Sequence, residues 1–117
     1  MSAILYGHLQ QFREHLNTNI KLRKLLGDWN IHVVLRATDP EINYTLVVEN
    51  GYLIDIVASE IIGPKMFVAE ATYQTFVEIF TGKLNPTEAV IDGDMSTYGE
   101  DKDESLLDGI ILIIWGF

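Results

Sequence analysis

Hydrophobic residues in the first quarter of the chain recur at the spacing of an amphipathic helix. Lys21, Arg23 and Lys24 fall near the C-terminal end of the same segment, where positive charge suits the helix dipole. Gly27 follows and can take the left-handed conformation that ends a helix. We therefore predict a helix over residues 3–26 that packs one apolar face against a core. The residues of that face are Leu5, Leu9, Phe12, Leu16, Ile20 and Leu26.

Three segments with a period of two follow the helix. They cover residues 31–36, 44–49 and 52–57, and this period predicts antiparallel strands with one packed face. Asp39-Pro40 marks the first turn, and Asn50-Gly51 predicts a two-residue hairpin because both residues can adopt positive φ. The three strands should therefore form a meander. In the third strand, Tyr52, Ile54 and Ile56 alternate with Leu53, Asp55 and Val57.

The second half of the chain alternates short strands with short helices. Glycine, proline and N-cap residues set the boundaries, because each of them ends or begins an element. We predict strands over residues 66–69 and 95–98, and between them one helix capped by Thr72 and stopped by Gly82 and another capped by Asn85 and stopped by Gly93.

The last segment, residues 106–115, carries two competing signals. Its four isoleucines are β-branched and favour a strand, whereas Ser105 and the acidic residues before it favour the start of a helix. We predict a helix with Ser105 as its N-cap. Almost no polar residue interrupts residues 110–115, so this helix must be buried on most sides or must cover an apolar surface.

Length and composition restrict the class of protein. The chain has 117 residues, of which 48% are hydrophobic, so we expect one folded domain over residues 1–117 and exclude intrinsic disorder. It contains no cysteine, which excludes a disulfide framework, thiol catalysis and thiolate metal sites. Acidic residues outnumber basic ones 17 to 8, giving a net charge of -9, and nucleic acid is therefore not an expected partner.

The charge is unevenly distributed along the chain. Residues 88–117 carry eight acids and only Lys102 as a base, whereas basic residues predominate in residues 1–36. The basic group around residue 21 has two interpretations, helix-end electrostatics with solubility or transient contact with an anionic membrane surface. No signal-peptide pattern is present, the longest apolar run is too short to span a bilayer, and Trp115-Gly116-Phe117 is not a peroxisomal signal. We expect a cytoplasmic protein.

Candidate chemistry is sparse. His8 and His15 are not at the four-residue spacing of helical zinc pairs, and His32 falls on a predicted strand. Asp92 and Asp94 flank Gly93, and the acids of residues 101–104 fit a solvated loop that leads into a helix. A catalytic carboxylate pair needs two contrasting environments within one cleft, and the sequence shows no such contrast. Nucleophile-elbow, phosphate-loop and dinucleotide motifs are all missing from the sequence. We expect no catalytic residue, no metal site and no cofactor, and the protein is not expected to be an enzyme.

Apolar residues after the sheet are the remaining signal. They are compatible either with a packed core or with the walls of a cavity, and periodicity does not decide between the two. The residues concerned are Phe76, Ile79, Phe80, Val90, Ile91, Leu106, Leu107, Ile110, Ile111 and Ile114.

Residues 76–90 resemble the signature of the sterol carrier protein lipid-transfer family. That signature has an apolar helix, then Gly-Lys-Leu-x-Pro, then an alanine and a bulky apolar residue. Its most specific part here is Gly82-Lys83-Leu84-Asn85-Pro86. The family signature continues with a glycine and an alternating strand that ends in Gly-Asp, and residues 91–100 are close to this part. The likeness covers about residues 28–117.

The resemblance implies an α+β fold in which helices cover a mostly antiparallel five-stranded sheet and enclose a hydrophobic tunnel. It implies non-catalytic binding of a fatty acid, fatty acyl-CoA, sterol or phospholipid. The acidic run of residues 100–104 should repel an anionic headgroup, which favours a neutral or carboxylate-only ligand buried tail-first. Tyr98, Tyr52 and His32 are candidate polar contacts. The residues implied to line the tunnel are Phe76, Ile79, Phe80, Val90, Ile91 and Met95, with Leu107, Ile110, Ile111 and Ile114 as a movable lid.

Two alternatives to a lipid carrier remain open. The same fold can act as a protein-interaction or dimerisation module within a larger assembly, with residues 110–115 as the interface and a homodimer as one form. A small enzyme acting on an apolar substrate would instead need a hydrophobic pocket that holds a histidine and a carboxylate within hydrogen-bond reach.

Overall fold

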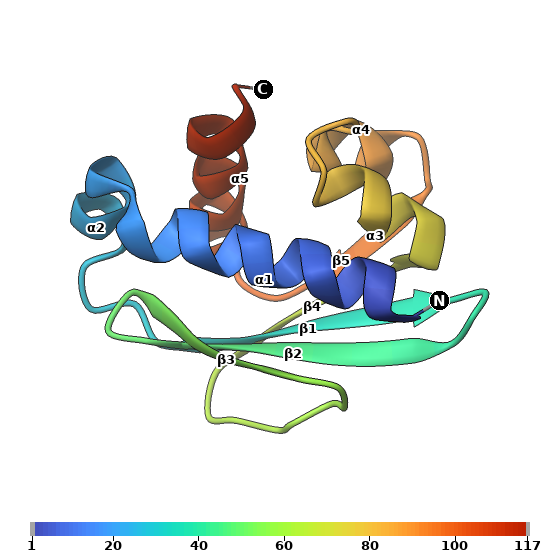
Figure 1. Cartoon of the computed structure of the whole chain (residues 1–117), viewed down its shortest axis with the longest axis horizontal. Coiled ribbons are helices and arrows are strands. Elements are labelled where there is room, and N and C mark those ends of the chain that lie inside the picture. The colour runs from blue at the N-terminus through green and yellow to red at the C-terminus, as the bar shows by residue number, and fades with distance from the viewer. Residues whose placement is uncertain (1, 117) are drawn as a thin grey trace.

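Residues 2–116, which the structure describes, form five helices on one face of a single five-stranded sheet in this computed structural model (Figure 1). The predicted α+β class and the helix-covered sheet are confirmed. The helices are α1 (Ser2–Thr18), α2 (Ile20–Leu26), α3 (Tyr73–Ile79), α4 (Pro86–Ile91) and α5 (Asp101–Trp115). The strands are β1 (Ile31–Thr38), β2 (Ile42–Glu49), β3 (Tyr52–Val57), β4 (Met66–Thr72) and β5 (Met95–Tyr98).

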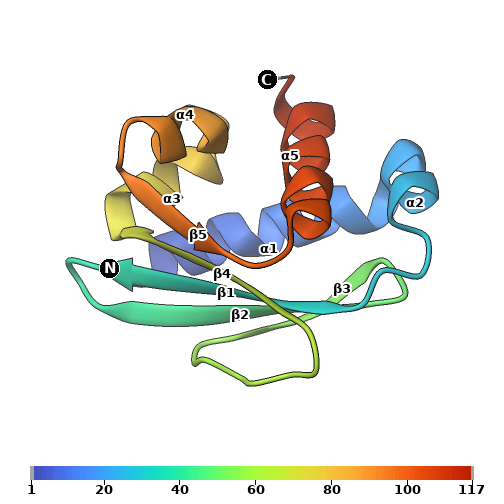
Figure 2. The ribbon, with the colours of Figure 1, turned by 180° about the vertical axis from the view of Figure 1, so that it is seen from behind.

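The sheet is mixed, although most of its pairings are antiparallel as predicted. Its strand order is β3-β2-β1-β4-β5, and the first three strands form the expected meander. β1 and β4 run parallel, with His32 opposite Met66 and Thr38 opposite Thr72. The parallel pair arises because residues 58–65 cross from the β3 edge beneath the sheet to the far side of β1, on the face without helices (Figures 1 and 2).

The single helix predicted over residues 3–26 is divided in two at Asn19. Asn19 has an extended backbone, and its side chain accepts a hydrogen bond of 3.1 Å from the backbone N–H of Leu22, which makes it the N-cap of α2. The break changes which side chains point inward, so that Leu22 is fully buried and Ile20 is 74% exposed. The prediction that Ile20 packs on the core is wrong, because a helical period holds only within one continuous helix.

An irregularity in β3 overturns the alternation predicted for that strand. The pairing register with β2 shifts between Val47 and Val48. Leu53 and Ile56 are consequently both buried, whereas Ile54 between them is 42% exposed. Leu53 and Ile56 therefore share the inward face of β3, although the predicted alternation places them on opposite faces of the strand.

Asn17 fastens α1 across this irregular edge strand. Its Nδ2 donates to the carbonyl of Leu53, and its Oδ1 accepts from the N–H of Leu53, both at 2.9 Å. Arg13 adds a hydrogen bond of 2.6 Å from Nη2 to the carbonyl of Ile54. The amide of Asn17 thus takes the place of a neighbouring strand and leaves less of the sheet edge unpaired.

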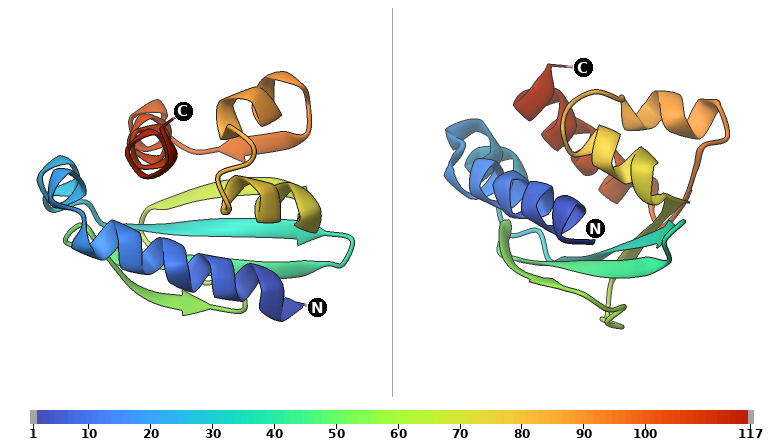
Figure 3. Two further views of the ribbon diagram at one scale, coloured as in Figure 1. Left: turned by 45° about the horizontal axis from the view of Figure 1, so that its top comes forward. Right: turned by 45° about the vertical axis from the view of Figure 1, so that its right-hand side comes forward.

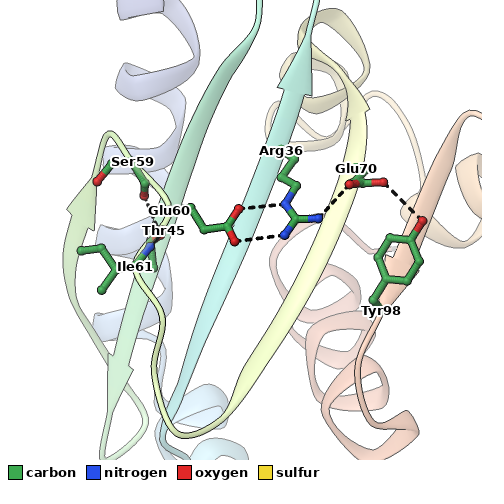
Figure 4. Close-up of polar contacts among 7 residues, drawn as sticks. All are labelled: Arg36, Thr45, Ser59, Glu60, Ile61, Glu70 and Tyr98. Carbon is green, nitrogen blue, oxygen red and sulfur yellow. Dashed lines mark hydrogen bonds and ion pairs between the residues drawn. The ribbon is translucent and has the colours of Figure 1, made fainter.

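The face of the sheet opposite the helices is covered by the crossing segment, residues 58–65 (Figure 4). Thr45 on β2 is fully buried there. Its hydroxyl donates to the carbonyl of Ser59 at 2.7 Å and accepts from the N–H of Ile61 at 3.0 Å. These two bonds satisfy a buried hydroxyl and hold the segment against the sheet.

Arg36 joins the same segment to the neighbouring strand. Its guanidinium makes two hydrogen bonds to Glu60, at 2.8 and 3.0 Å, and one to Glu70 on β4 at 2.9 Å (Figure 4). The hydroxyl of Tyr98 donates to the other carboxylate oxygen of Glu70 at 3.3 Å. The hydrogen bonds raise the pKa of Arg36 and lower the pKa of Glu60. This polar network lies on the solvent side of the sheet, away from the helices.

The predicted caps of α3 and α4 are both present. Thr72 accepts a hydrogen bond from the N–H of Thr75 at 3.1 Å, and Asn85 accepts one from the N–H of Thr87 at 2.9 Å, with Pro86 as the first helical residue. These caps place the two short helices side by side above β4 and β5 (Figure 3).

Gly82, in the loop between α3 and α4, lies directly against the indole ring of Trp115 at the end of α5. Its φ is +77°, and a Cβ at this position would overlap the ring. Trp115 also stacks on Phe12, with ring centroids 6.0 Å apart. The loop can approach the end of α5 this closely only because residue 82 is glycine.

The last segment is a helix, as predicted, but it begins earlier than expected. Its N-cap is Glu100, and Ser105 lies inside α5. The acids expected in a solvated loop form the first turn instead, where carboxylates suit the positive end of the helix dipole. One of them, Asp103, is fully buried.

Candidate functional site: an apolar cavity between the sheet and three helices

A cavity of about 170 Å³ lies between the helix-covered face of the sheet and the helices α3, α4 and α5. The sheet supplies its floor, because alternate residues of β1, β2, β4 and β5 point toward the helices. The floor residues are Val33, Leu35, Leu46, Phe67, Ala69, Met95 and Thr97, and the walls are Phe12, Phe76, Ile79, Phe80, Pro86, Thr87, Val90, Ile91, Glu104, Leu107, Asp108 and Ile111.

The cavity opens to solvent between α4 and α5. Ile91 is 76% exposed and Val90 is 39% exposed, although both line the cavity. Thr87 on α4 and Asp108 on α5 are lining residues that also reach the surface. Figures 1 and 3 show that α4 and α5 lie on the same side of the sheet. Exposed apolar side chains at such a rim are available to cover the apolar part of a ligand.

The polar groups of the cavity are concentrated at this opening. Glu104 on α5 accepts a hydrogen bond of 2.8 Å from the hydroxyl of Thr97 on β5, which fixes the position of its carboxylate. Asp108 lies one helical turn further along the same face of α5. Burial, and after it the negative charge of Glu104, raises the pKa of the Asp108 carboxyl.

Eight of the ten residues proposed from the sequence as ligand contacts line this one cavity. They are Phe76, Ile79, Phe80, Val90, Ile91, Met95, Leu107 and Ile111. Ile110 is instead fully buried in the core, and Ile114 is half-buried against it, so neither lines the cavity. On α5, the residues Leu107 and Ile111 face the cavity because they lie one turn apart on one side of the helix.

The candidate polar contacts named from the sequence all lie elsewhere. His32 is on the opposite face, with its Nδ1 3.0 Å from the carbonyl of Ile61, and Tyr98 points toward Glu70 on that face. Tyr52 lies under the guanidinium of Arg23, 3.8 Å from ring centroid to Cζ. The prediction that these three side chains serve as polar tips of the site is therefore wrong.

Sequence reasoning missed the polar rim and every floor residue except Met95. The floor was accessible in principle, because β1 places Val33 and Leu35 on the same face of a strand. Glu104 was hidden by the late helix start predicted at Ser105, whereas Asp108 already lay within the predicted helix. Once α5 begins at residue 101, their spacing of four puts both on the face that also carries Leu107 and Ile111.

Within residues 2–116, the structure contains no group of three or more histidine and acidic side chains that could hold a metal ion. The lining of the cavity includes carboxylates but no histidine. In the same part of the chain, every helix is too short or too polar to cross a membrane.

Comparison with known proteins identifies the fold of this chain. No protein-family model and no curated protein matches the chain. Among solved structures, the sterol carrier protein domain 2 of Helicoverpa armigera matches with a TM-score of 0.76 at 14% identity, over 97% of this chain and 90% of that one. A crystal structure of sterol carrier protein 2 matches with a TM-score of 0.64 at 20% identity, over 92% of each chain. The chain has the sterol carrier protein 2 fold.

The sterol carrier protein 2 fold also occurs inside a longer enzyme. The stereoselective inverting sec-alkylsulfatase Pisa1 from Pseudomonas sp. matches with a TM-score of 0.62 at 17% identity, over 75% of this chain but only 14% of that chain. At these identities the likeness establishes the sterol carrier protein 2 fold of this chain, as the resemblance of residues 76–90 predicted.

Proposed function

We propose that this protein binds and carries a hydrophobic ligand in the cavity between the sheet and helices α3, α4 and α5, without catalysing a reaction. The observation that carries the proposal is an apolar cavity that reaches solvent through an opening rimmed by exposed Val90 and Ile91. The ligand classes implied by the sterol carrier resemblance are a fatty acid, a fatty acyl-CoA, a sterol or a phospholipid. A cytoplasmic location belongs to the same proposal.

The size of the cavity limits how a ligand would lie. A volume of about 170 Å³ is close to that of an engineered cavity of about 150 Å³ that holds benzene. It encloses a short alkyl segment or one ring, so the remainder of a long ligand would lie in the opening between α4 and α5 unless those helices move apart.

Hydrophobic transfer supplies enough free energy for this mode of binding. Complete burial of a ten-carbon chain would contribute on the order of 8 kcal/mol at about 0.8 kcal/mol per methylene, and the part of the chain that lies in the opening contributes less. Loss of ligand freedom and ordering of side chains offset much of this gain, which leaves an affinity in the micromolar range. The binding site itself needs no charged group for this purpose, since the floor and most of the walls are hydrocarbon.

The proposal is tested by titration with a neutral apolar fluorophore such as N-phenyl-1-naphthylamine, followed by displacement with decanol. We expect saturable binding at one site and complete displacement. Val90→Trp and Ile91→Trp place a bulky ring on the rim of the opening and should weaken binding at least about tenfold. Native mass spectrometry of the freshly purified protein should also detect a retained ligand.

Ile62→Trp provides the matched control, because Ile62 is an exposed apolar residue in the crossing segment on the opposite side of the sheet. It should bind the fluorophore like the unmodified protein. Absence of saturable binding, or equal weakening by Ile62→Trp and by the two rim variants, would refute the carrier function.

A second candidate function is favoured by a different surface. Ile20 and Leu25 on α2 and Leu112 on α5 are exposed apolar residues. Leu25 lies so close to α5 that a Cβ added at Gly109 would touch it, so the two helices form one patch. This patch suits a protein-interaction or dimerisation module. Size-exclusion chromatography of Leu112→Glu tests it, because a shift from dimer to monomer with unchanged fluorophore binding would separate this role from ligand carriage.

A further inference from the structure

The polar lining of the cavity is entirely acidic or neutral. Four of the lining side chains are polar, namely Thr87, Thr97, Glu104 and Asp108, and the described lining contains no lysine, arginine or histidine. An anionic head group at the opening would therefore meet two carboxylates and no cation.

The two carboxylates are positioned by the fold. The hydroxyl of Thr97 on β5 holds Glu104 through a hydrogen bond of 2.8 Å. Asp108 follows at a spacing of four on α5, so the two side chains are neighbours on one face. Among the described residues, neither carboxylate takes part in an ion pair. Both negative charges thus remain available to a ligand.

The net negative charge of the segments around the opening also disfavours an anionic head group. Residues 88–117 contain eight acids and a single base, Lys102, and they supply α5, β5 and most of α4 around the opening. A cleft lined by one sign of charge with apolar walls concentrates ligands of the opposite sign. A primary ammonium suits this site, because it carries three hydrogen-bond donors and no acceptor.

We propose that the cavity selects amphiphiles with a cationic nitrogen head group, whose apolar tail enters between the sheet and α3 while the head lies between Glu104 and Asp108. The inference rests on the proposed carrier function and narrows its ligand class. Carboxylate and phosphate head groups are disfavoured, and this revises the expectation that a carboxylate-only ligand is compatible with the site.

The test compares three ligands that share one ten-carbon tail, decylamine, decanol and decanoate, each below its critical micelle concentration. Their affinities are measured by displacement of N-phenyl-1-naphthylamine at neutral pH and low ionic strength. We expect decylamine to bind at least about tenfold more tightly than decanoate, with decanol between them, and the difference to shrink in high salt.

The double variant Glu104→Gln, Asp108→Asn keeps the size and hydrogen-bonding capacity of both side chains but removes their charge. It should reduce the preference for decylamine over decanoate to within about threefold, by weakening decylamine binding and strengthening decanoate binding. The matched control Glu14→Gln, Asp28→Asn removes the same charge from exposed residues that do not line the cavity, and it should keep the full preference.

The outcomes separate the two proposals. If decanoate binds as tightly as decylamine, or if the control variant loses the preference as strongly as the cavity variant, cation selectivity at Glu104 and Asp108 is refuted while ligand carriage stands. If none of the three ligands displaces the fluorophore, the carrier function itself fails and the selectivity with it.

Discussion

The indole Nε1 of Trp29 donates a hydrogen bond of 3.0 Å to Oδ1 of Asp103. Asp103 is fully buried, and the same oxygen lies 3.1 Å from Nζ of Lys65, which is partly exposed. Three segments distant in sequence meet at this carboxylate: the approach to β1, the approach to β4 and the first turn of α5. The carboxylate therefore anchors the helix that forms one wall of the cavity.

Asp103→Ala should destabilise the protein by about 3 kcal/mol, because it leaves a buried indole N–H and a lysine without their shared partner. Asp103→Asn should cost less, since its amide oxygen can still accept from Trp29. The free energy of unfolding in urea measures both effects. Asp101→Ala, which changes an exposed acid in the same helical turn, is the control and should cost no more than about 1 kcal/mol. Equal losses for the Asp101 and Asp103 variants would contradict an anchoring role.

The sequence alone predicts most of the architecture, because the signals for its elements are local. The turn at Asn50-Gly51 and the caps at Thr72 and Asn85 depend only on nearby residues, and all three occur where predicted. The meander follows from the period of two in the first three strands. The parallel pairing of β1 with β4 has no local signal, since it depends on how the crossing segment packs beneath the sheet.

The errors have two physical origins, a local N-cap that divides the first helix and tertiary contacts that override a local pattern elsewhere. Asn19 interrupts the first helix and turns Ile20 outward. The irregularity in β3 lies where Asn17 bonds to both backbone groups of Leu53, and neither residue indicates this pairing in the sequence. The sequence pattern places Asp103 in a charged loop, whereas the structure shows its partners on two other segments.

The candidate site likewise has a part that the sequence predicts and a part that it does not. The apolar wall residues were predictable, because Phe76, Ile79 and Phe80 repeat at helical spacing within a recognisable motif. The acidic rim was not, because its detection requires the true start of α5 and the register of β5, which brings Thr97 to Glu104.

Gly82 and Trp115 give a physical reason for the glycine of the Gly-Lys-Leu-Asn-Pro block. Gly82→Ala introduces a Cβ that overlaps the indole ring and places alanine at positive φ, so we expect a loss of at least about 2 kcal/mol in the free energy of unfolding. The loss should be smaller in a Trp115→Ala background, where the overlap is absent and only the backbone cost remains. Urea unfolding of the four combinations measures this coupling.

Gly7→Ala is the matched control for this substitution. Gly7 lies within α1, and a Cβ there would meet open space, so alanine should stabilise the helix by up to about 1 kcal/mol. If Gly82→Ala behaved like Gly7→Ala, or if its cost were the same with and without Trp115, the close approach of the loop to the indole would not be what requires glycine.

The environment of Asp108 should make the free energy of unfolding depend on pH, and it sets the sign of that dependence. Burial and the neighbouring Glu104 raise its pKa in the folded state, so the folded protein holds this proton more tightly than the unfolded chain does. Its contribution to stability is fully present below the ordinary carboxyl pKa of about 3.9 and is lost as the pH rises through the elevated value. At neutral pH the ionised side chain therefore destabilises the fold.

Asp108→Asn, which is neutral at every pH, should be more stable than the unmodified protein at neutral pH by about 0.5 kcal/mol, the size of a like-charge pair at this helical spacing. The difference should vanish on acidification, as measured by urea unfolding at a series of pH values. Asp101→Asn, an exposed acid at the start of α5 that does not line the cavity, should show no such gain at neutral pH. A constant difference between Asp108→Asn and the unmodified protein at all pH values would mean that charge at the opening is not its cause.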